Sequence, residues 1–179
     1  MASAFQERKL RGMFAAFDAD GDGYLREEDF TALVDRWSRL PGVGPGTDLR
    51  RRVEALLMGW WAALLEAGDA NGDGAVDMGE LLSLVDQLPA MVSDVTATAD
   101  TVFDAVDANG DGRISPEEHR GLVETWNGQP TDLTGVFELL DLNGDGHLGR
   151  EEFAQLWLQF WTSDDPAEPG NWLCGRFSD

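Results

Sequence analysis

Residues 107–118 read DANGDGRISPEE, and the chain repeats this pattern three more times, as DADGDGYLREED at 18–29, DANGDGAVDMGE at 69–80 and DLNGDGHLGREE at 141–152. Each copy is twelve residues long and begins with Asp. Asp or Asn stands third, Asp fifth, Gly sixth, an aliphatic residue eighth and a carboxylate twelfth. Such a regular repeat indicates that one small structural unit is used four times.

The spacing of the polar residues suits a hard divalent cation. Calcium takes six to eight oxygen ligands at roughly 2.3–2.6 Å, and short side chains at positions one, three and five can converge on it only if the backbone wraps tightly. Glycine at position six permits the left-handed turn that this wrapping needs. A single Asp-Asn-Gly segment would more often be a solvated turn. Four in register, each between apolar helical patterns, favour calcium-binding loops.

The candidate metal ligands follow from these loop positions. They are Asp18, Asp20, Asp22, Tyr24 and Asp29 in the first loop; Asp69, Asn71, Asp73, Ala75, Asp77 and Glu80 in the second; Asp107, Asn109, Asp111, Arg113, Ser115 and Glu118 in the third; and Asp141, Asn143, Asp145, His147 and Glu152 in the fourth. The seventh residue of each loop offers only its backbone carbonyl, so its side chain is free to vary. We expect up to four calcium ions, one in each loop.

The first loop departs from the other three. It ends in Asp29, which is one methylene shorter than Glu, and Arg26 at its ninth position puts a positive charge beside the ion. Magnesium prefers six ligands at shorter distances, so we expect this loop to carry magnesium or to bind calcium more weakly. In the fourth loop Gly149 stands at position nine, where water must substitute for a side chain.

The segments on both sides of each loop have apolar residues at spacings of three and four, which predicts helices. In the third loop Ser115, Pro116 and Glu118 also form a capping-box pattern. Glu118 could therefore cap the helix or bind the metal, and we expect it to bind the metal. The predicted fold class is all-α, with two pairs of helix–loop–helix units packed into one compact body. The eighth loop residues should form short antiparallel β-bridges, joining the first loop to the second and the third to the fourth; they are Leu25, Val76, Ile114 and Leu148.

Helix breakers divide the chain. The stretch 41–46, PGVGPG, should end one helix, and Thr47 or Asp48 should cap a long helix over about 49–66. A second break near Leu88-Pro89 predicts an N-terminal pair at 1–88 and a C-terminal pair at 89–165. The remaining segment, 166–179, contains GNWLCGRF and should fold back on the body.

Composition narrows the choice of partners and location. The chain has 34 Asp and Glu against 13 Lys and Arg, a formal net charge of −21, which disfavours nucleic acid and anionic membranes as partners. The single cysteine, Cys174, allows neither a disulfide within the chain nor a Cys-based zinc site.

Neither a signal sequence nor a membrane-spanning run is evident, so we expect a cytoplasmic monomer. With two histidines, no plausible nucleophile arrangement and no phosphate-cradling loop, we expect no enzymatic activity.

The four loops, the wide spacing between the first and second, and the Asp that ends the first resemble the EF-hands of sarcoplasmic calcium-binding proteins and of the bacterial calerythrin group. The resemblance spans about residues 5–165. It implies a compact helical body with calcium and magnesium sites and a buffering role. In that group the second loop is often degenerate, whereas residues 69–80 are intact here. Photoproteins and luciferin-binding proteins resemble the same architecture.

The resemblance leaves three roles open. Sensors open a Met-rich groove when calcium binds, but this chain has five scattered Met against seven Trp and nine Phe. We therefore favour a calcium buffer or transporter over a sensor that regulates a protein target. A carrier of a small apolar ligand is a third hypothesis, since the aromatic residues could line a cavity. His119 is interpreted as a partly buried residue at the core edge, with a pH-sensitive switch as the alternative.

Overall fold

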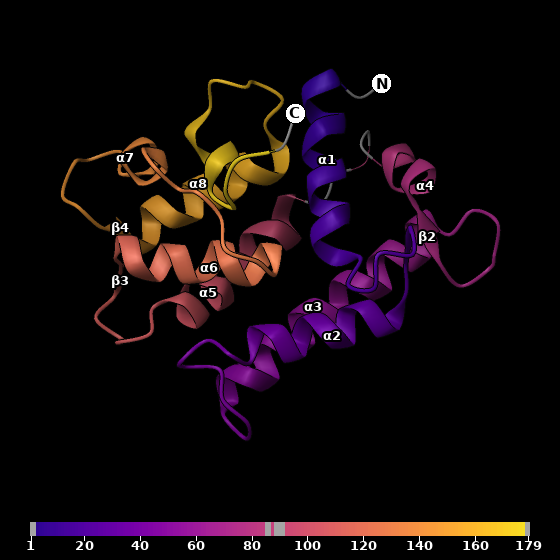
Figure 1. The fold of residues 1–179 in the computed structure, drawn as a ribbon, viewed down its shortest axis with the longest axis horizontal. Helices are drawn as coiled ribbons and strands as arrows, with labels where there is room; N and C mark the ends of the chain where they lie inside the picture. Colours follow the sequence, from indigo (N-terminus) through magenta and orange to yellow (C-terminus); the bar gives the residue numbers. More distant parts are fainter. Residues whose placement is uncertain (1–2, 85–86, 88–91, 178–179) are drawn as a thin grey trace.

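The computed structural model describes residues 3–84, 87 and 92–177 and is mostly helical, as expected (Figure 1). The elements are α1 (Ala4–Phe17), β1 (Tyr24–Leu25), α2 (Glu27–Trp37), α3 (Asp48–Gly68), β2 (Val76–Asp77), α4 (Met78–Ser83), α5 (Val92–Val106), β3 (Arg113–Ile114), α6 (Pro116–Asn127), α7 (Val136–Leu140), β4 (Leu148–Gly149), α8 (Arg150–Thr162) and the 3-10 turn η2 (Pro169–Trp172). Among the described helices, none combines the length and the apolar character that crossing a bilayer requires.

The loops pair as the sequence predicted. Strand β1 runs antiparallel to β2, with Leu25 opposite Val76, and β3 runs antiparallel to β4, with Ile114 opposite Leu148. These four side chains are fully buried. Each bridge therefore fixes two loops back to back and anchors both in the apolar core.

Local sequence explains where the helices begin and end. Thr47 caps α3 by accepting a hydrogen bond from the Arg50 N–H at 3.1 Å, and the helix continues to Gly68, directly before the second loop. Helix α7 has only five residues. Pro130 and Gly135, the latter with φ of 73°, confine it to the single turn before the fourth loop.

An aromatic cluster at the centre joins the helices of the first two loops to those of the last two. Trp60 of α3 stacks on Phe17 of α1 with ring centroids 6.0 Å apart and on Trp157 of α8 at 6.2 Å. Trp126 of α6 contacts Phe17 at 5.2 Å and Trp161 of α8 at 6.2 Å. Large rings in such edge and stacked contacts bury much apolar area and hold their helices in one arrangement.

The segment after α8 lies against the body. Leu173 and Cys174 are buried, and the Leu173 carbonyl lies 2.8 Å from Nε2 of His119. His119 is only 1 % exposed, so it is buried more completely than the core-edge position we expected, because this segment covers it. The expected boundary between the pairs, at Leu88-Pro89, lies outside the described residues.

Candidate metal centres

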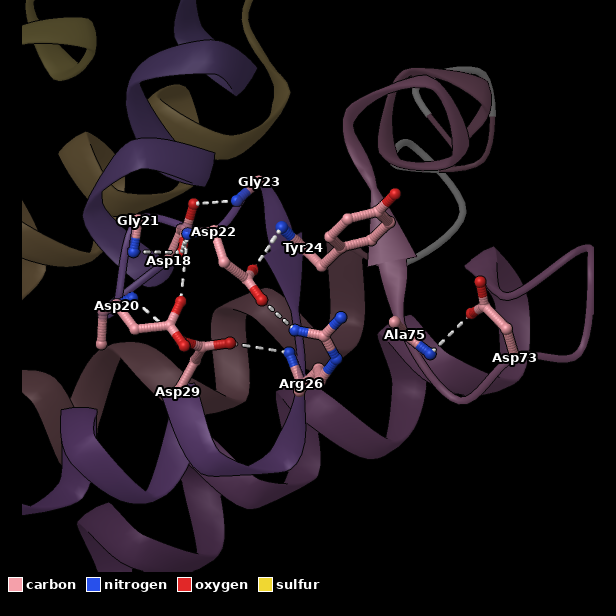
Figure 2. Close-up of polar contacts among 11 residues, drawn as sticks. Asp18, Asp20, Gly21, Asp22, Gly23, Tyr24, Arg26, Asp29, Asp73 and Ala75 are labelled. Atoms are coloured by element: carbon pink, nitrogen blue, oxygen red, sulfur yellow. Dashed lines mark hydrogen bonds and ion pairs between the residues drawn. The ribbon is translucent and has the colours of Figure 1, made fainter.

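The first residue of each loop organises the backbone around it. In the first loop the Asp18 carboxylate accepts hydrogen bonds from the N–H groups of Gly21, Asp22 and Gly23, at 2.8, 3.2 and 3.0 Å (Figure 2). The carboxylates of Asp69 and Asp141 accept the same three bonds in their own loops. The chain is thus wound around one carboxylate, and the remaining lone pairs of its oxygens are left for a cation.

Two glycines in each loop make this winding sterically allowed. The sixth-position glycines have φ between 77° and 86°, in the left-handed region, as the sequence predicted. The glycines at position four, such as Gly21, are also left-handed, with φ from 69° to 74°. Sequence reasoning did not single out position four. The signal was present, because all four repeats have glycine there.

The side chains of positions one, three and five converge. Asp18, Asp20 and Asp22 each offer a carboxylate oxygen, and these oxygens lie within 4.8 Å of one another. Two ligands on opposite sides of a calcium ion are about 4.6–5.2 Å apart, twice the calcium–oxygen distance. The three oxygens therefore fit within the ligand shell of one divalent ion. Oxygen-only donors of this kind suit calcium and magnesium rather than softer metals.

In the other loops an Asn amide replaces the carboxylate at position three. Asn71 and Asn143 accept the N–H of the fifth residue at 2.8 and 2.9 Å, as Asp20 does at 3.1 Å. The carbonyl oxygen of the amide thus has the same place in the loop as the carboxylate. An uncharged oxygen there leaves the ligand count unchanged and lowers the negative charge of the site.

The twelfth residue ties the two ends of each loop together. Glu80 accepts the N–H groups of Ala70 and Asp77 at 3.1 and 3.0 Å, and Glu118 and Glu152 accept the corresponding groups of their loops. These bonds also cap the helix that follows. The carboxylate thus lies at the loop, where the same oxygens could close the shell of a bound cation.

Asp29 makes the same two bonds with a shorter side chain. It accepts the N–H groups of Ala19 and Arg26 at 3.0 and 2.8 Å (Figure 2). It is 4 % exposed, whereas the three loop-ending glutamates are half-buried. Burial raises the pKa of Asp29, and the nearby carboxylates of Asp20 and Asp18 act in the same direction. A cation in the first loop would offset this desolvation.

Arg26 also distinguishes the first loop. Its guanidinium forms an ion pair with Asp22, the fifth-position ligand, and the hydrogen bond holds the pKa of Asp22 below its usual value (Figure 2). An incoming cation must share that carboxylate with Arg26 or displace the guanidinium. In the second loop the ninth residue is Asp77, which adds negative charge instead.

One polar contact near the loops has no counterpart in the repeat pattern. Nη2 of Arg36, on α2, donates to the carbonyls of Ala16 and Trp126, both at 2.8 Å. Ala16 lies two residues before the first loop ligand, and Trp126 lies near the end of α6. The bonds span 20 and 90 residues, so no local sequence signal could have revealed them.

Comparison with protein families matches residues 96–158 to an EF-hand domain pair, residues 1–36 to a second EF-hand domain pair and residues 62–85 to an EF hand. A curated relative, the probable calcium-binding protein CML17 of Oryza sativa subsp. japonica, is 38% identical over 79 residues. That match covers 44% of this chain, and the chain spans 39% of the length of this relative.

Solved structures match over nearly the whole chain. The sarcoplasmic calcium-binding protein from amphioxus is 22% identical with a TM-score of 0.75, covering 99% of this chain and 100% of that one. A Streptomyces coelicolor calcium-binding protein is 23% identical with a TM-score of 0.72, covering 89% and 99%. Okadaic acid binding protein 2.1 is 21% identical with a TM-score of 0.77, covering 100% and 99%.

The resemblance inferred from the repeats is confirmed. The matching families are EF-hands, and the amphioxus and Streptomyces neighbours are calcium-binding proteins rather than enzymes, which agrees with the expectation that this chain has no catalytic role. The chain is an EF-hand calcium-binding protein that has the fold of the sarcoplasmic calcium-binding proteins.

Proposed function

We propose that this protein is a monomeric cytoplasmic calcium buffer or transporter that binds a divalent cation in each of its four loops and stays closed when it does. The observation that carries the proposal is the central aromatic cluster. Its rings come from helices of both halves of the chain, so the apolar faces that a sensor would expose are packed against each other.

A comparison of the free energy needed to expose the cluster with that supplied by calcium binding favours the closed state. A tryptophan buries about 150–250 Å², so exposing two of them would cost about 8–12 kcal/mol at roughly 25 cal/mol per Å². Calcium at one hundred times its Kd supplies about 2.7 kcal/mol per site. Only the difference in affinity between the open and closed states can drive opening. Opening this cluster would therefore require a large affinity difference at several sites together.

Charge couples cation binding to folding. The formal net charge is −21, and the carboxylates of each loop repel one another at close range when no ion is bound. Each bound divalent ion neutralises two of these negative charges. The apo protein should be much less stable than the loaded one, as a buffer with cation-dependent folding requires.

The first loop is proposed as the calcium/magnesium site. The short Asp29 favours a six-coordinate shell over a larger one, and Arg26 already engages one ligand carboxylate. The other three loops end in Glu and are proposed as calcium sites. A buffer of this kind would hold magnesium at rest and exchange it when calcium rises.

Calorimetric titration of the apo protein with calcium, with and without millimolar magnesium, tests the proposal together with a hydrophobic dye. We expect four divalent sites, one of them retaining magnesium, and no calcium-dependent rise in dye fluorescence. Two or fewer sites would contradict the ligand assignment. A strong dye response to calcium would instead support a sensor that acts on a protein target.

A small apolar cavity supports carriage of a small ligand as a second candidate. It has a volume of about 80 Å³ and is lined by residues that include Leu10, Met13, Trp60, Leu64 and Trp161. The buried Trp161 indole N–H has no hydrogen-bond partner within the described residues. A coelenterazine-binding protein is among the structural neighbours, at 19% identity and a TM-score of 0.60.

The size of this cavity places the carrier hypothesis second. Drug-sized ligands occupy roughly 300–1,000 Å³, so the cavity suits only a small apolar molecule that carries one hydrogen-bond acceptor. Native mass spectrometry of the freshly purified protein should show a co-purified small molecule if the protein is a carrier. A mass equal to the polypeptide and its cations would leave buffering as the function.

A further inference from the structure

A groove runs between α1 and the end of α6, beside the C-terminal segment. The segment that follows α8 approaches α1, where the Phe5 and Phe177 rings are in edge contact at 6.4 Å (Figure 1). The groove has a volume of about 570 Å³, within the roughly 300–1,000 Å³ of small-molecule sites. None of the metal ligands lines it.

The face of α1 explains why the groove is open. Residues 4, 7, 8, 11, 12 and 15 recur at spacings of three and four, so they share one side of the helix. Three of them, Ala4, Gly12 and Ala15, have little or no side chain. The opposite wall includes Trp126 and Phe177. The Phe177 ring closes over Gly12, 3.0 Å from where a Cβ would be, so the open part of the groove is bounded by the other lining residues.

The charge of the groove is opposite to that of the whole chain. Arg8, Arg11 and Arg176 line it, and Glu7 is the only acidic residue among its described lining residues. These three arginines come from a chain with 13 basic residues and a net charge of −21. Arg11 is exposed, and Nη2 of Arg176 donates to the Thr134 carbonyl at 2.7 Å.

A fourth guanidinium, that of Arg36, contacts two lining residues but is not itself part of the lining. Arg36 donates to the carbonyls of Ala16 and Trp126, two residues that line the groove. Its buried Nε has no hydrogen-bond partner within the described residues. Guanidinium groups bind carboxylates and phosphates through paired, charge-assisted hydrogen bonds.

We propose that this groove binds a small organic anion, a carboxylate or a phosphate ester with an apolar body. The arginines engage the anionic group, and the apolar body lies along Trp126, Phe177 and the small residues of α1. At physiological salt the Debye length is about 8 Å. Carboxylates beyond this distance are largely screened, so the nearby charges matter most: Arg8, Arg11 and Arg176 outnumber Glu7 on the lining, and Asp132 interacts with Arg176.

The site connects to the calcium loops. Helix α1 ends at Phe17, immediately before Asp18, and α6 follows the third loop, so an anion between these helices bridges elements attached to both halves of the chain. Because calcium fixes the loops to which both helices are attached, calcium and the anion should strengthen each other's binding, by the same factor in both directions.

NMR titration of the calcium-loaded full-length protein tests the proposal. The probes are octanoate, octyl phosphate, inorganic phosphate and octanol as the neutral control. We expect saturable shifts at Gly12, Ala15 and Asn127 with octanoate or octyl phosphate, with a Kd below about 1 mM. A response to octanoate alone identifies a carboxylate ligand, and a response to octyl phosphate alone identifies a phosphate ester.

Matched variants distinguish binding in the groove from nonspecific electrostatic attraction of the anion. Arg11→Gln should weaken binding about tenfold through loss of a charge-assisted hydrogen bond, whereas Arg51→Gln, the same change at an exposed arginine of α3, should have no effect. Ala15→Leu should fill the groove and weaken binding without changing the charge. Arg11→Gln should leave the calcium stoichiometry intact, so a failure here is distinct from a failure of the buffer proposal. Absence of saturable binding, equal binding of octanol, or equal weakening by Arg51→Gln would overturn the proposal.

Discussion

The four loops share their first, fourth, fifth and sixth residues, and the side chains at the ninth and twelfth positions set the first loop apart from the others. In the first loop the twelfth residue is Asp29, which makes with a shorter side chain the two backbone bonds that Glu80 makes in the second. The ninth residue, Arg26, is ion-paired with Asp22. These two substitutions are the physical basis for our proposal that the first site differs from the others in cation preference.

Changing Asp29→Glu should raise the calcium affinity of the first loop relative to magnesium by about tenfold, because a longer carboxylate can bind through both oxygens. The amide of Gly23, which donates to Asp18 at 3.0 Å, reports this loop separately in NMR titrations. Glu152→Asp is the matched control in the fourth loop and should shift that site toward magnesium. An unchanged preference in both variants would show that position twelve does not set selectivity here.

Lys9 is the residue with the clearest pH signature. The residue is 8 % exposed, and its ammonium donates to the Ser163 carbonyl at 3.0 Å and to Oδ1 of Asn171 at 2.9 Å. Burial lowers the pKa of Lys9 to about 8, against weaker opposing effects of Cys174 and Asp164. The unfolded chain therefore binds this proton more tightly than the folded one between about pH 8 and pH 10.5.

The stability of the folded state should consequently rise with pH across that window. Relative to Lys9→Met, the free energy of unfolding should increase by about 1–2 kcal/mol between pH 7 and pH 9.5. Denaturant melts of both proteins in excess calcium measure this difference. Burial raises the pKa of Cys174, which opposes the trend at high pH, but that thiol is present in both proteins and cancels. A constant difference between the two proteins would show that Lys9 is not desolvated.

At this scale the sequence alone predicts the ligand positions, because the conformation of each loop is determined by its own twelve residues. Contacts such as Lys9 with Asn171 join residues 162 positions apart, and nothing in their neighbours marks them. The same holds for Arg36 and Trp126. Long-range polar contacts depend on how helices pack, which a periodic pattern does not specify.

At the level of elements, the β-bridges and the capped helices were predictable, while the length of α7 was not. A buried aliphatic residue at position eight and a cap at position nine or nearby are local signals. Apolar residues continue before α7 as far as Leu133, but Gly135 has a left-handed backbone conformation, so the helix cannot begin before Val136. Backbone conformation at one glycine overrides the hydrophobic period.

Arg36, on α2, links α1 and α6 by donating from its Nη2 group to one carbonyl of each. Arg36→Met keeps the length of the side chain and removes both bonds. We expect a loss of about 2–3 kcal/mol in the free energy of unfolding, since two hydrogen bonds from a charged donor are lost at buried residues. Denaturant unfolding in excess calcium measures the loss, and Arg39→Met, an exposed neighbour, should change stability by less than about 0.5 kcal/mol. Similar losses in both variants would argue against a linking role.

At the scale of the whole molecule, the two halves of the chain meet through tryptophan and phenylalanine rings. The composition predicted an aromatic core, and the apolar faces of the helices were visible in the sequence. The partners of each ring were not, because stacking of Trp60 on Trp157, almost one hundred residues away, is decided by packing. This packing is the basis on which we propose a closed buffer rather than an opening sensor.

Small-angle scattering of the apo, magnesium-loaded and calcium-loaded forms, read together with their NMR spectra, addresses this closed state most directly. We expect the magnesium and calcium forms to share one compact envelope and nearly the same tryptophan side-chain signals, with expansion confined to the apo form. A calcium form larger than the magnesium form, with indole signals moved to solvent-exposed positions, would contradict a closed buffer.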